Sequence, residues 1–190
     1  WSSPVEIPQL SAGWDWNTDI TIDKDGSAVG LIRGGTTVHA TNYTDPSTWK
    51  ILKCENLQFP GWIGASVEDP HIWKQNGVYH AIAHAFLPFY GVHAYAPIPD
   101  PSFDCTCQLN WTVTGVAYDN IVNFTDGTSH SYARRERPHL VRDRSGSILA
   151  LSNGVQYDGK LRSVNQDGVF TLVQPTVRPH HGRIRVDTFK

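Results

Sequence analysis

Hydrophobic and polar residues alternate over short stretches of this 190-residue chain, and most stretches end in a turn signal. Alternation with a period of two is typical of strands with one buried face. A dipeptide such as Asn-Gly or Asp-Gly between two such stretches predicts a hairpin. A helical period is nowhere sustained over about 11 residues, so we expect little or no helix. The turn signals are Asp25-Gly26, Asn76-Gly77, Asp126-Gly127, Ser145-Gly146, Asn153-Gly154, Asp158-Gly159 and Asp167-Gly168.

Three segments share one plan of strand, turn and strand. Their first strands are predicted at residues 18–22, 70–73 and 138–141, so the units start 52 and 68 residues apart. This spacing is close to that of four-stranded propeller blades, which take ~40 to 50 residues before insertions. We therefore predict an all-β protein with a β-propeller architecture, and expect a fourth unit at residues 160–174.

The number of blades that this length can supply is below that of a closed ring. At ~50 residues per blade the chain makes fewer than four blades, whereas closed propellers have at least about four. We expect residues 1–176 to form three to four blades of an incomplete ring and residues 177–190 to form a basic tail. Since no Met occurs, we expect a processed chain or fragment whose ring is completed by another segment or chain.

Charge and hydropathy exclude two classes of partner. The chain has 16 Lys and Arg against 18 Asp and Glu, a net charge of −2 and no basic stripe, so nucleic acid is not expected as a partner. No apolar run approaches the ~20 residues of a membrane span, so no membrane partner is expected either. The 7 Trp side chains offer flat faces that suit stacking on sugar rings, although each serves equally well for core packing.

Sequons and cysteines indicate a secretory route. Three sequons begin at Asn42, Asn110 and Asn123, and we expect these residues to carry glycans. Of the three cysteines, Cys105 and Cys107 lie too close together for an easy bridge, so Cys54 is expected to pair with one of them. The other is left for a segment or chain outside this sequence. No second Cys or His pair has the spacing of zinc ligands, so zinc is not expected.

The best candidate chemistry lies in two related blocks, Glu68-Asp69-Pro70-His71 and Glu136-Arg137-Pro138-His139. Both precede an innermost strand, and such strands line the central funnel of a propeller. We expect Asp69 and Glu136 to face each other across one cavity, because two carboxylates flanking a glycosidic bond can hydrolyse it. The alternative is that these residues form ion pairs that hold the blade junctions.

These blocks, with several others, resemble a set of secreted eukaryotic proteins that are themselves similar to family-43 glycoside hydrolases. The resemblance extends from about residue 14 to residue 175 and implies a five-bladed propeller of the arabinanase, levansucrase and invertase kind. The blocks are Glu68-Asp69-Pro70-His71-Ile72-Trp73, Asn76-Gly77-Val78-Tyr79-His80, Gly91-Val92-His93-Ala94-Tyr95, residues 111–118, Arg134-Arg135-Glu136-Arg137-Pro138-His139-Leu140, Leu151-Ser152-Asn153-Gly154-Val155 and residues 171–175.

The resemblance implies roles for two of the three carboxylates that such hydrolases use. Glu136 matches the general acid, with Arg137 in place of the family's Gly, and Asp69 matches the Asp that tunes the acid. The general base is expected upstream of this sequence, since the early candidates Asp15 and Asp19 lack the family's Asp-Pro setting.

Further residues are expected around the funnel. Hydrolases of this kind need no cofactor, but a calcium ion often lies in their channel near a histidine, which makes His84 a candidate for its shell; a buried structural histidine is the alternative. The residues expected to bind sugar are His71, His139, Trp73, Arg135 and Arg137.

Three functions fit these observations. The first is a secreted glycoside hydrolase acting on a polysaccharide or oligosaccharide, provided that its base comes from elsewhere. The second is a lectin-like propeller that binds carbohydrate without turnover, for which a cleft of aromatic residues would speak. The third is a glycosylated structural subunit of an extracellular assembly. The aromatic residues expected in such a cleft are Trp62, Trp73, Phe89 and Tyr90.

Overall fold

The computed structural model contains thirteen strands, which account for most of the described residues. Within the described residues, the one helix with defined bounds is the short 3-10 helix η2 (Pro46–Thr48). None of these residues forms a helix that is long and apolar enough to span a membrane. The all-β prediction is confirmed. The described residues are 4–7, 10, 17–52, 57, 67–85, 90–97, 109–124, 126–157 and 169–176.

The strands form three antiparallel meanders, which we call blades 1 to 3, and one separate hairpin. Blade 1 contains β1 (Thr18–Ile22), β2 (Ala28–Ile32), β3 (Thr36–Ala40) and β4 (Trp49–Ile51), in that order. Blade 2 contains β5 (Val67–Gln75), β6 (Val78–Ala85), β7 (Gly91–Pro97) and β8 (Thr112–Tyr118). Blade 3 contains β11 (Arg134–Arg142), β12 (Ile148–Gln156) and β13 (Val169–Pro175), and the hairpin pairs β9 (Ile121–Asn123) with β10 (Ser129–Ser131).

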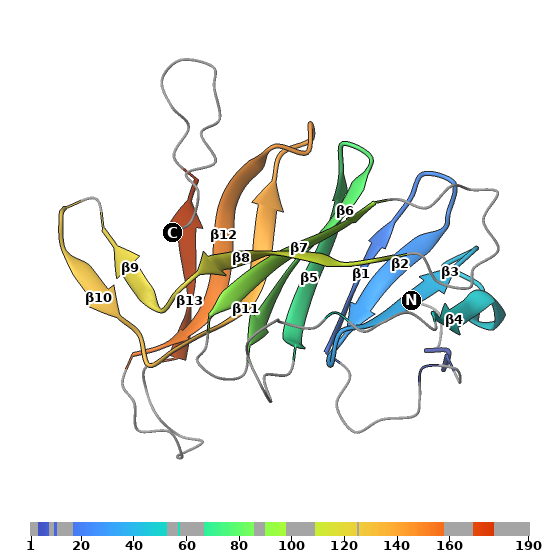
Figure 1. Ribbon diagram of the computed structural model, residues 1–190, viewed down its shortest axis with the longest axis horizontal. Coiled ribbons are helices and arrows are strands. Elements are labelled where there is room, and N and C mark those ends of the chain that lie inside the picture. The colour runs from blue at the N-terminus through green and yellow to red at the C-terminus, as the bar shows by residue number, and fades with distance from the viewer. Residues whose placement is uncertain are drawn as a thin grey trace.

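The first strand of each blade lies next to the first strand of its neighbour. Strand β1 packs against β5, and β5 packs against β11, so the three strands run side by side through the middle of the molecule (Figure 1). The other strands of each blade follow outward in sequence order. Inner strands that meet in this way are the arrangement of a β-propeller, and the chain forms a partial one.

The three predicted repeat units coincide with the three inner hairpins, β1–β2, β5–β6 and β11–β12. The expected fourth unit at residues 160–174 is wrong in its described part, because β13 pairs with β12 as the third strand of blade 3. The Asn76-Gly77 hairpin has two central residues at φ 52° and 74°, as a type I′ turn requires.

One predicted turn is not a turn. Asn153 and Gly154 lie inside β12, where both pair with β13 and Gly154 also pairs with Glu136 of β11. Asn153 is buried, and its side-chain oxygen accepts a hydrogen bond from Arg135. The dipeptide therefore has a tertiary function at a place where local propensity favoured a turn. The signals Asp158-Gly159 and Asp167-Gly168 lie outside the described residues.

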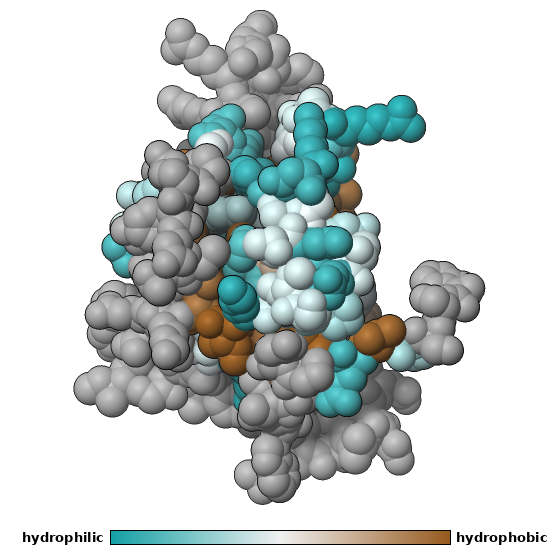
Figure 2. Space-filling model, turned by 90° about the vertical axis from the view of Figure 1, so that its right-hand side faces the viewer, coloured by the Kyte–Doolittle hydropathy of each residue, from teal (hydrophilic) through white to brown (hydrophobic). Residues whose placement is uncertain are grey.

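Apolar faces between adjacent blades form the core. Between blades 1 and 2, Leu31, Ile72 and Tyr79 belong to one buried cluster. Between blades 2 and 3, Trp73, Tyr118 and Leu151 belong to a second cluster. The outer side of blade 1, seen in Figure 2, carries mostly hydrophilic and neutral residues with a smaller hydrophobic area. Burial between the blades thus fixes the positions of the inner strands.

Substitution of Gly91 tests the packing of blade 2. Gly91 pairs with Tyr118, and a Cβ atom at Gly91 would overlap with the buried ring of that tyrosine. We expect Gly91→Ala to lower the free energy of unfolding by about 2 kcal/mol or more, because overpacking in a core forces shifts of rigid neighbours. Urea denaturation measures the change.

Gly154→Ala is the matched control within a strand, since the nearest atom that its Cβ would meet is the Glu136 carbonyl oxygen at 3.9 Å. We expect this variant to keep the wild-type free energy of unfolding within about 1 kcal/mol. Equal stability of the two variants would contradict the described packing of Tyr118.

Candidate functional site

Matching bulges place the polar residues at the start of two inner strands. The register of β5 shifts between Glu68 and His71, and that of β11 shifts between Glu136 and His139. In each bulge the residue before proline has a left-handed backbone: φ is 45° at Asp69 and 53° at Arg137. Such a conformation is uncommon for residues other than glycine and costs about 1 to 3 kcal/mol. The repeat is therefore structural as well as sequential.

This register changes which carboxylates correspond. Glu68 and Glu136 are equivalent in the two bulges, and Asp69 is the equivalent of Arg137. The sequence predicted Asp69 and Glu136 as site residues, whereas Glu68 was not among the predicted ones. The signal that would have identified Glu68 was its place in the repeated pattern of Glu, any residue, Pro and His.

His84 lies at the centre of three carboxylates. Its ring is fully buried, with Nδ1 3.8 Å from Glu68 Oε2 and 3.7 Å from Asp69 Oδ2. Its Nε2 atom is 3.9 Å from Glu136 Oε1. Asp69 and Glu136 thus lie on opposite sides of one imidazole ring. We call Glu68, Asp69, Glu136 and His84 the carboxylate cluster.

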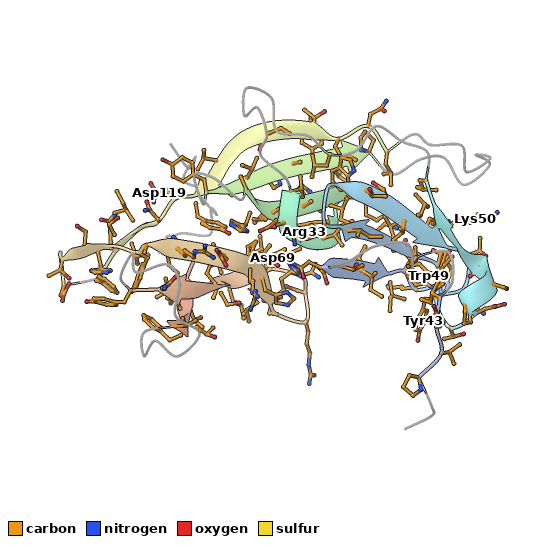
Figure 3. All side chains as sticks on the ribbon, turned by 90° about the horizontal axis from the view of Figure 1, so that it is seen from below. Arg33, Tyr43, Trp49, Lys50, Asp69 and Asp119 are labelled. Carbon is orange, nitrogen blue, oxygen red and sulfur yellow. The ribbon has the colours of Figure 1, made fainter. Side chains whose placement is uncertain are left out.

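Arginines approach each carboxylate of this cluster. Arg33, which follows β2, forms an ion pair with Glu68, and Figure 3 shows Arg33 and Asp69 close together near the middle of the molecule. Arg134 Nη1 donates to Glu136 Oε1 at 3.1 Å, and Arg137 Nε is 3.8 Å from Asp69 Oδ2. Two of these pairs, Arg33 with Glu68 and Arg137 with Asp69, join different blades. The residues of the two blocks therefore form ion pairs at the blade junctions, which was the alternative to a catalytic role.

The cluster is partly open to solvent on the side of blade 3. The side chain of Glu136 is 20% exposed and that of Arg137 is 77% exposed, whereas Glu68 and Asp69 are largely buried. Asn17 also donates a hydrogen bond from Nδ2 to Asp69 Oδ1, across from blade 1. A ligand approaching from solvent would therefore meet Arg137 and Glu136 before the other two carboxylates.

The donors around His84 do not favour calcium. Ca²⁺ takes six to eight oxygen ligands at ~2.3 to 2.6 Å, and such oxygens must be available to it. Here each carboxylate already has a guanidinium group nearby, and the imidazole lies between the carboxylates. The arginines therefore already neutralise the negative charge that a bound cation would otherwise balance. A calcium site at His84 stays a prediction.

A second polar group lies further along the same strands. Asp19 Oδ2 accepts hydrogen bonds from His71 Nδ1 and from the Ile72 backbone N–H, both at 2.8 Å. The ring centroids of His71 and His139 are 4.1 Å apart. Asp19, His71 and His139 occupy the same position in the three repeat units, 52 and 68 residues apart along the chain. The structure thus brings together one residue from each blade.

The surroundings lower the pKa values of Asp19 and His139. Burial alone would raise the pKa of Asp19, but hydrogen bonds from His71 and Ile72 and the charges of both histidines outweigh it, so this pKa lies below its ordinary value. Burial and the neighbouring His71 lower the pKa of His139. At neutral pH, Asp19 is therefore an acceptor and His139 a neutral imidazole.

A row of rings continues outward from His71 across blade 2. Trp73 stacks on His71 at a centroid distance of 5.7 Å and on His80 at 5.1 Å. His80 Nδ1 is 3.1 Å from His93 Nε2, and His93 Nδ1 is 2.7 Å from Thr114 Oγ1. Trp73 is buried against blade 3. Its faces contact protein, so the structure does not present it as a sugar platform.

Arg135 is directed away from the carboxylate cluster. It is 2% exposed, and its guanidinium group donates to Asn153 Oδ1, the Asp119 carbonyl and Gln174 Oε1. It also lies 4.6 Å above the Tyr118 ring. The structure assigns Arg135 to the interior of blade 3, in contrast to the sugar-binding position expected for it. Local sequence does not distinguish it from Arg134 and Arg137.

The predicted sites of modification are placed only in part. Asn42, Asn110 and Asn123 are exposed, and glycosylation at these residues stays a prediction. The three cysteines lie outside the described residues, as do Asp15, Trp62, Phe89 and the basic tail.

Comparison with known proteins yields structural neighbours alone. No family model matches the chain, and no curated protein matches it. An α-L-arabinanase from Cellvibrio cellulosa, complexed with arabinohexaose, has a TM-score of 0.48 and 11% identity over 75% of this chain. The chain spans 48% of that enzyme, which is about half of its length.

Two further solved structures are similar at the same level. An exo-1,5-α-L-arabinanase from a bovine ruminal metagenomic library has a TM-score of 0.43 and 12% identity, covering 83% of this chain and 78% of its own. An endo-1,4-β-xylanase from Bacteroides thetaiotaomicron VPI-5482 has a TM-score of 0.46 and 15% identity, covering 85% and 58%. Likeness at this level does not identify an activity, which depends on the residues of the site.

Replacement of Arg135 distinguishes an interior role from a ligand contact. We expect Arg135→Met to lower the free energy of unfolding by about 2 to 4 kcal/mol, because Asn153 and Gln174 would lose a buried donor. Urea denaturation checks this value. Arg144→Met, at an exposed position, is the control and should change stability by less than about 0.5 kcal/mol. Wild-type stability of Arg135→Met would contradict the interior role.

The row of rings predicts acid sensitivity. Burial and the nearby His80 lower the pKa of His93 to about 4, whereas an unfolded histidine titrates near 6.5. The unfolded state therefore binds more protons below pH 6.5, and stability falls as the pH decreases from 6.5 towards 4. Between pH 7 and pH 5, we expect wild type to lose about 1 kcal/mol more than His93→Gln, after allowance for solvent screening.

Urea denaturation at the two pH values measures this difference. Ser129→Ala, at an exposed position in β10 that does not titrate, is the control and should lose as much as wild type. If His93→Gln lost as much stability between pH 7 and pH 5 as wild type, His93 would not be the source of the acid sensitivity.

Proposed function

We propose that the carboxylate cluster is a carbohydrate site and that it supports glycoside hydrolysis, with Glu136 as general acid. The observation that carries this proposal is the convergence of Glu68, Asp69 and Glu136 on buried His84. Hydrolysis of a glycosidic bond needs one carboxyl group that donates a proton and another that acts as base, nucleophile or charge stabiliser.

The separation of the carboxylates supports this chemistry. Because Asp69 and Glu136 lie on opposite sides of one imidazole ring, their nearest oxygens are no more than about 10 Å apart. Inverting glycosidases hold two carboxyl groups ~6.5 to 9.5 Å apart, and retaining enzymes hold them about 5 Å apart. Both separations are within this limit.

The surroundings suggest a role for each residue. Glu136 is the more exposed carboxylate and can deliver a proton to a leaving oxygen, after which Arg134 stabilises its charge. Asp69 is held by Asn17 and Arg137 and can stabilise positive charge that develops on the sugar. Exposed Arg137 and His139 are available to sugar hydroxyl groups. The substrate we propose is a polysaccharide or oligosaccharide, encountered by a secreted protein.

Binding without turnover is the second candidate, and one observation favours it. Every carboxylate of the cluster already has an arginine within 4 Å, as in a structural or recognition site. A charge-balanced cluster can hydrogen-bond sugar hydroxyls without donating a proton. The same ion pairs are the basis for a purely structural subunit.

Two assays on arabino-oligosaccharides and xylo-oligosaccharides separate these functions. Release of reducing ends measures hydrolysis, and calorimetry measures binding. For an enzyme, we expect Glu136→Gln to lower the rate by about 100-fold or more while affinity changes little, because a general acid acts in the transition state. Asp69→Asn should also lower the rate. Glu6→Gln is the control, because Glu6 is exposed and distant in sequence from the carboxylate cluster, and it should keep wild-type activity.

The other outcomes are equally specific. Binding without hydrolysis, weakened by Asp69→Asn and Glu136→Gln, would favour the lectin-like function. A panel of plant-type and algal-type oligosaccharides that neither bind nor react would contradict a carbohydrate site and favour the structural subunit.

A further inference from the structure

We propose that His71 and His139 bind a divalent transition-metal ion of the Zn²⁺ class, with Asp19 as the carboxylate that orients His71. Each of these three residues offers one donor atom, and the three atoms lie within 4.8 Å of one another. No other group of three or more His, Cys, Asp and Glu residues among the described ones meets this criterion. The site lies beside the carboxylate cluster and shares none of its residues.

The hydrogen bond between Asp19 and His71 determines which nitrogen is available. A carboxylate can only accept, so in the 2.8 Å contact His71 Nδ1 is the donor to Asp19 Oδ2. In the neutral tautomer with its proton on Nδ1, Nε2 carries the lone pair that binds a metal. A carboxylate that holds one nitrogen of a histidine while the other nitrogen binds metal is a common arrangement in metalloproteins.

The free nitrogen of His71 is an independent indication of a ligand. His71 is 4% exposed, and no group in the described part of the chain hydrogen-bonds to its Nε2 atom. A buried polar atom without a partner costs free energy. A metal ion at this atom would satisfy it.

His139 supplies the second ligand from the neighbouring blade. Its ring centroid is 4.1 Å from that of His71, and it is exposed, so its ring can turn and solvent can complete the coordination sphere. Imidazole ligands suit Zn²⁺, Ni²⁺, Co²⁺ and Cu²⁺, whereas Ca²⁺ and Mg²⁺ prefer oxygen.

A second histidine pair in blade 2 provides a matched comparison. His80 Nδ1 and His93 Nε2 are 3.1 Å apart and use these nitrogens for a hydrogen bond to each other. His93 Nδ1 is engaged with Thr114. Within the described residues, neither histidine of this pair hydrogen-bonds to a carboxylate, so the pair lacks the feature that distinguishes His71.

Titration of the untagged, metal-free protein with ZnCl₂ in a calorimeter tests the proposal, and the visible absorption of the Co²⁺ complex reports imidazole coordination. We expect one ion per chain, and we expect His139→Ala to weaken binding more than 100-fold. Asp19→Asn should weaken it 10- to 100-fold, the usual effect of losing a partner that orients a ligand. His93→Gln is the control and should change affinity less than twofold.

His180 and His181 are adjacent histidines outside the described residues and are replaced by alanine in a second control, which should keep the affinity of wild type. Absence of Zn²⁺ binding to wild type, or binding that survives His139→Ala, would overturn the proposal. A loss of binding in the tail variant would assign the ion to the tail and would also overturn it. Circular dichroism of each variant checks that it is folded.

The outcome is read separately from the proposed hydrolysis, although His139 takes part in both proposals. The readout is the affinity of the metal itself and requires no turnover or sugar. Glu136→Gln, which tests the carboxylate cluster, leaves all three residues of the metal site in place. Failure of either proposal therefore leaves the other open to its own experiment.

Discussion

The bulges at the start of β5 and β11 set the geometry of the centre of this molecule. In each, a left-handed residue and a proline interrupt the pairing with the next strand, so the glutamate before the bulge and the histidine after it belong to separate paired stretches. The strain of about 1 to 3 kcal/mol per bulge is offset by burial of the blade faces on both sides. Without these bulges the charged layer and the histidine layer would lie in a different register.

Charge balance is the second constraint on the centre. Largely buried carboxylates are costly unless they are paired, and Arg33, Arg134 and Arg137 supply partners from blades 1 and 3. These pairs link the blades at the same place where the candidate chemistry lies. Stability and the proposed function thus depend on the same residues. For any substitution in the cluster, both the free energy of unfolding and the activity must be measured.

The two proposed sites follow from one repeat with different residues at its equivalent positions. The first position holds Asn17, Asp69 and Arg137, and the position two residues later holds Asp19, His71 and His139. The first set builds part of a charged cluster that is suited to sugars, and the second builds a group that is suited to a metal. A repeated backbone therefore offers adjacent layers whose chemistry depends on which blade supplies each side chain.

The sequence by itself determined the strands, their hairpins and the region of the site. Alternation and local turn residues predicted the β1–β2, β5–β6 and β11–β12 hairpins, because these features depend on neighbours in the chain. The repeated Pro-His blocks also directed attention to Asp69 and Glu136, which contact one histidine.

Tertiary structure decided what depends on contacts between blades. It placed Asn153 inside a strand to accept from Arg135, joined Arg33 to Glu68, and brought Asp19, His71 and His139 together from three blades. The expectation that zinc is absent rested on residues close in sequence, whereas the proposed metal site joins residues from different blades. Residues 52 and 68 positions apart become neighbours only when the blades pack around their inner strands.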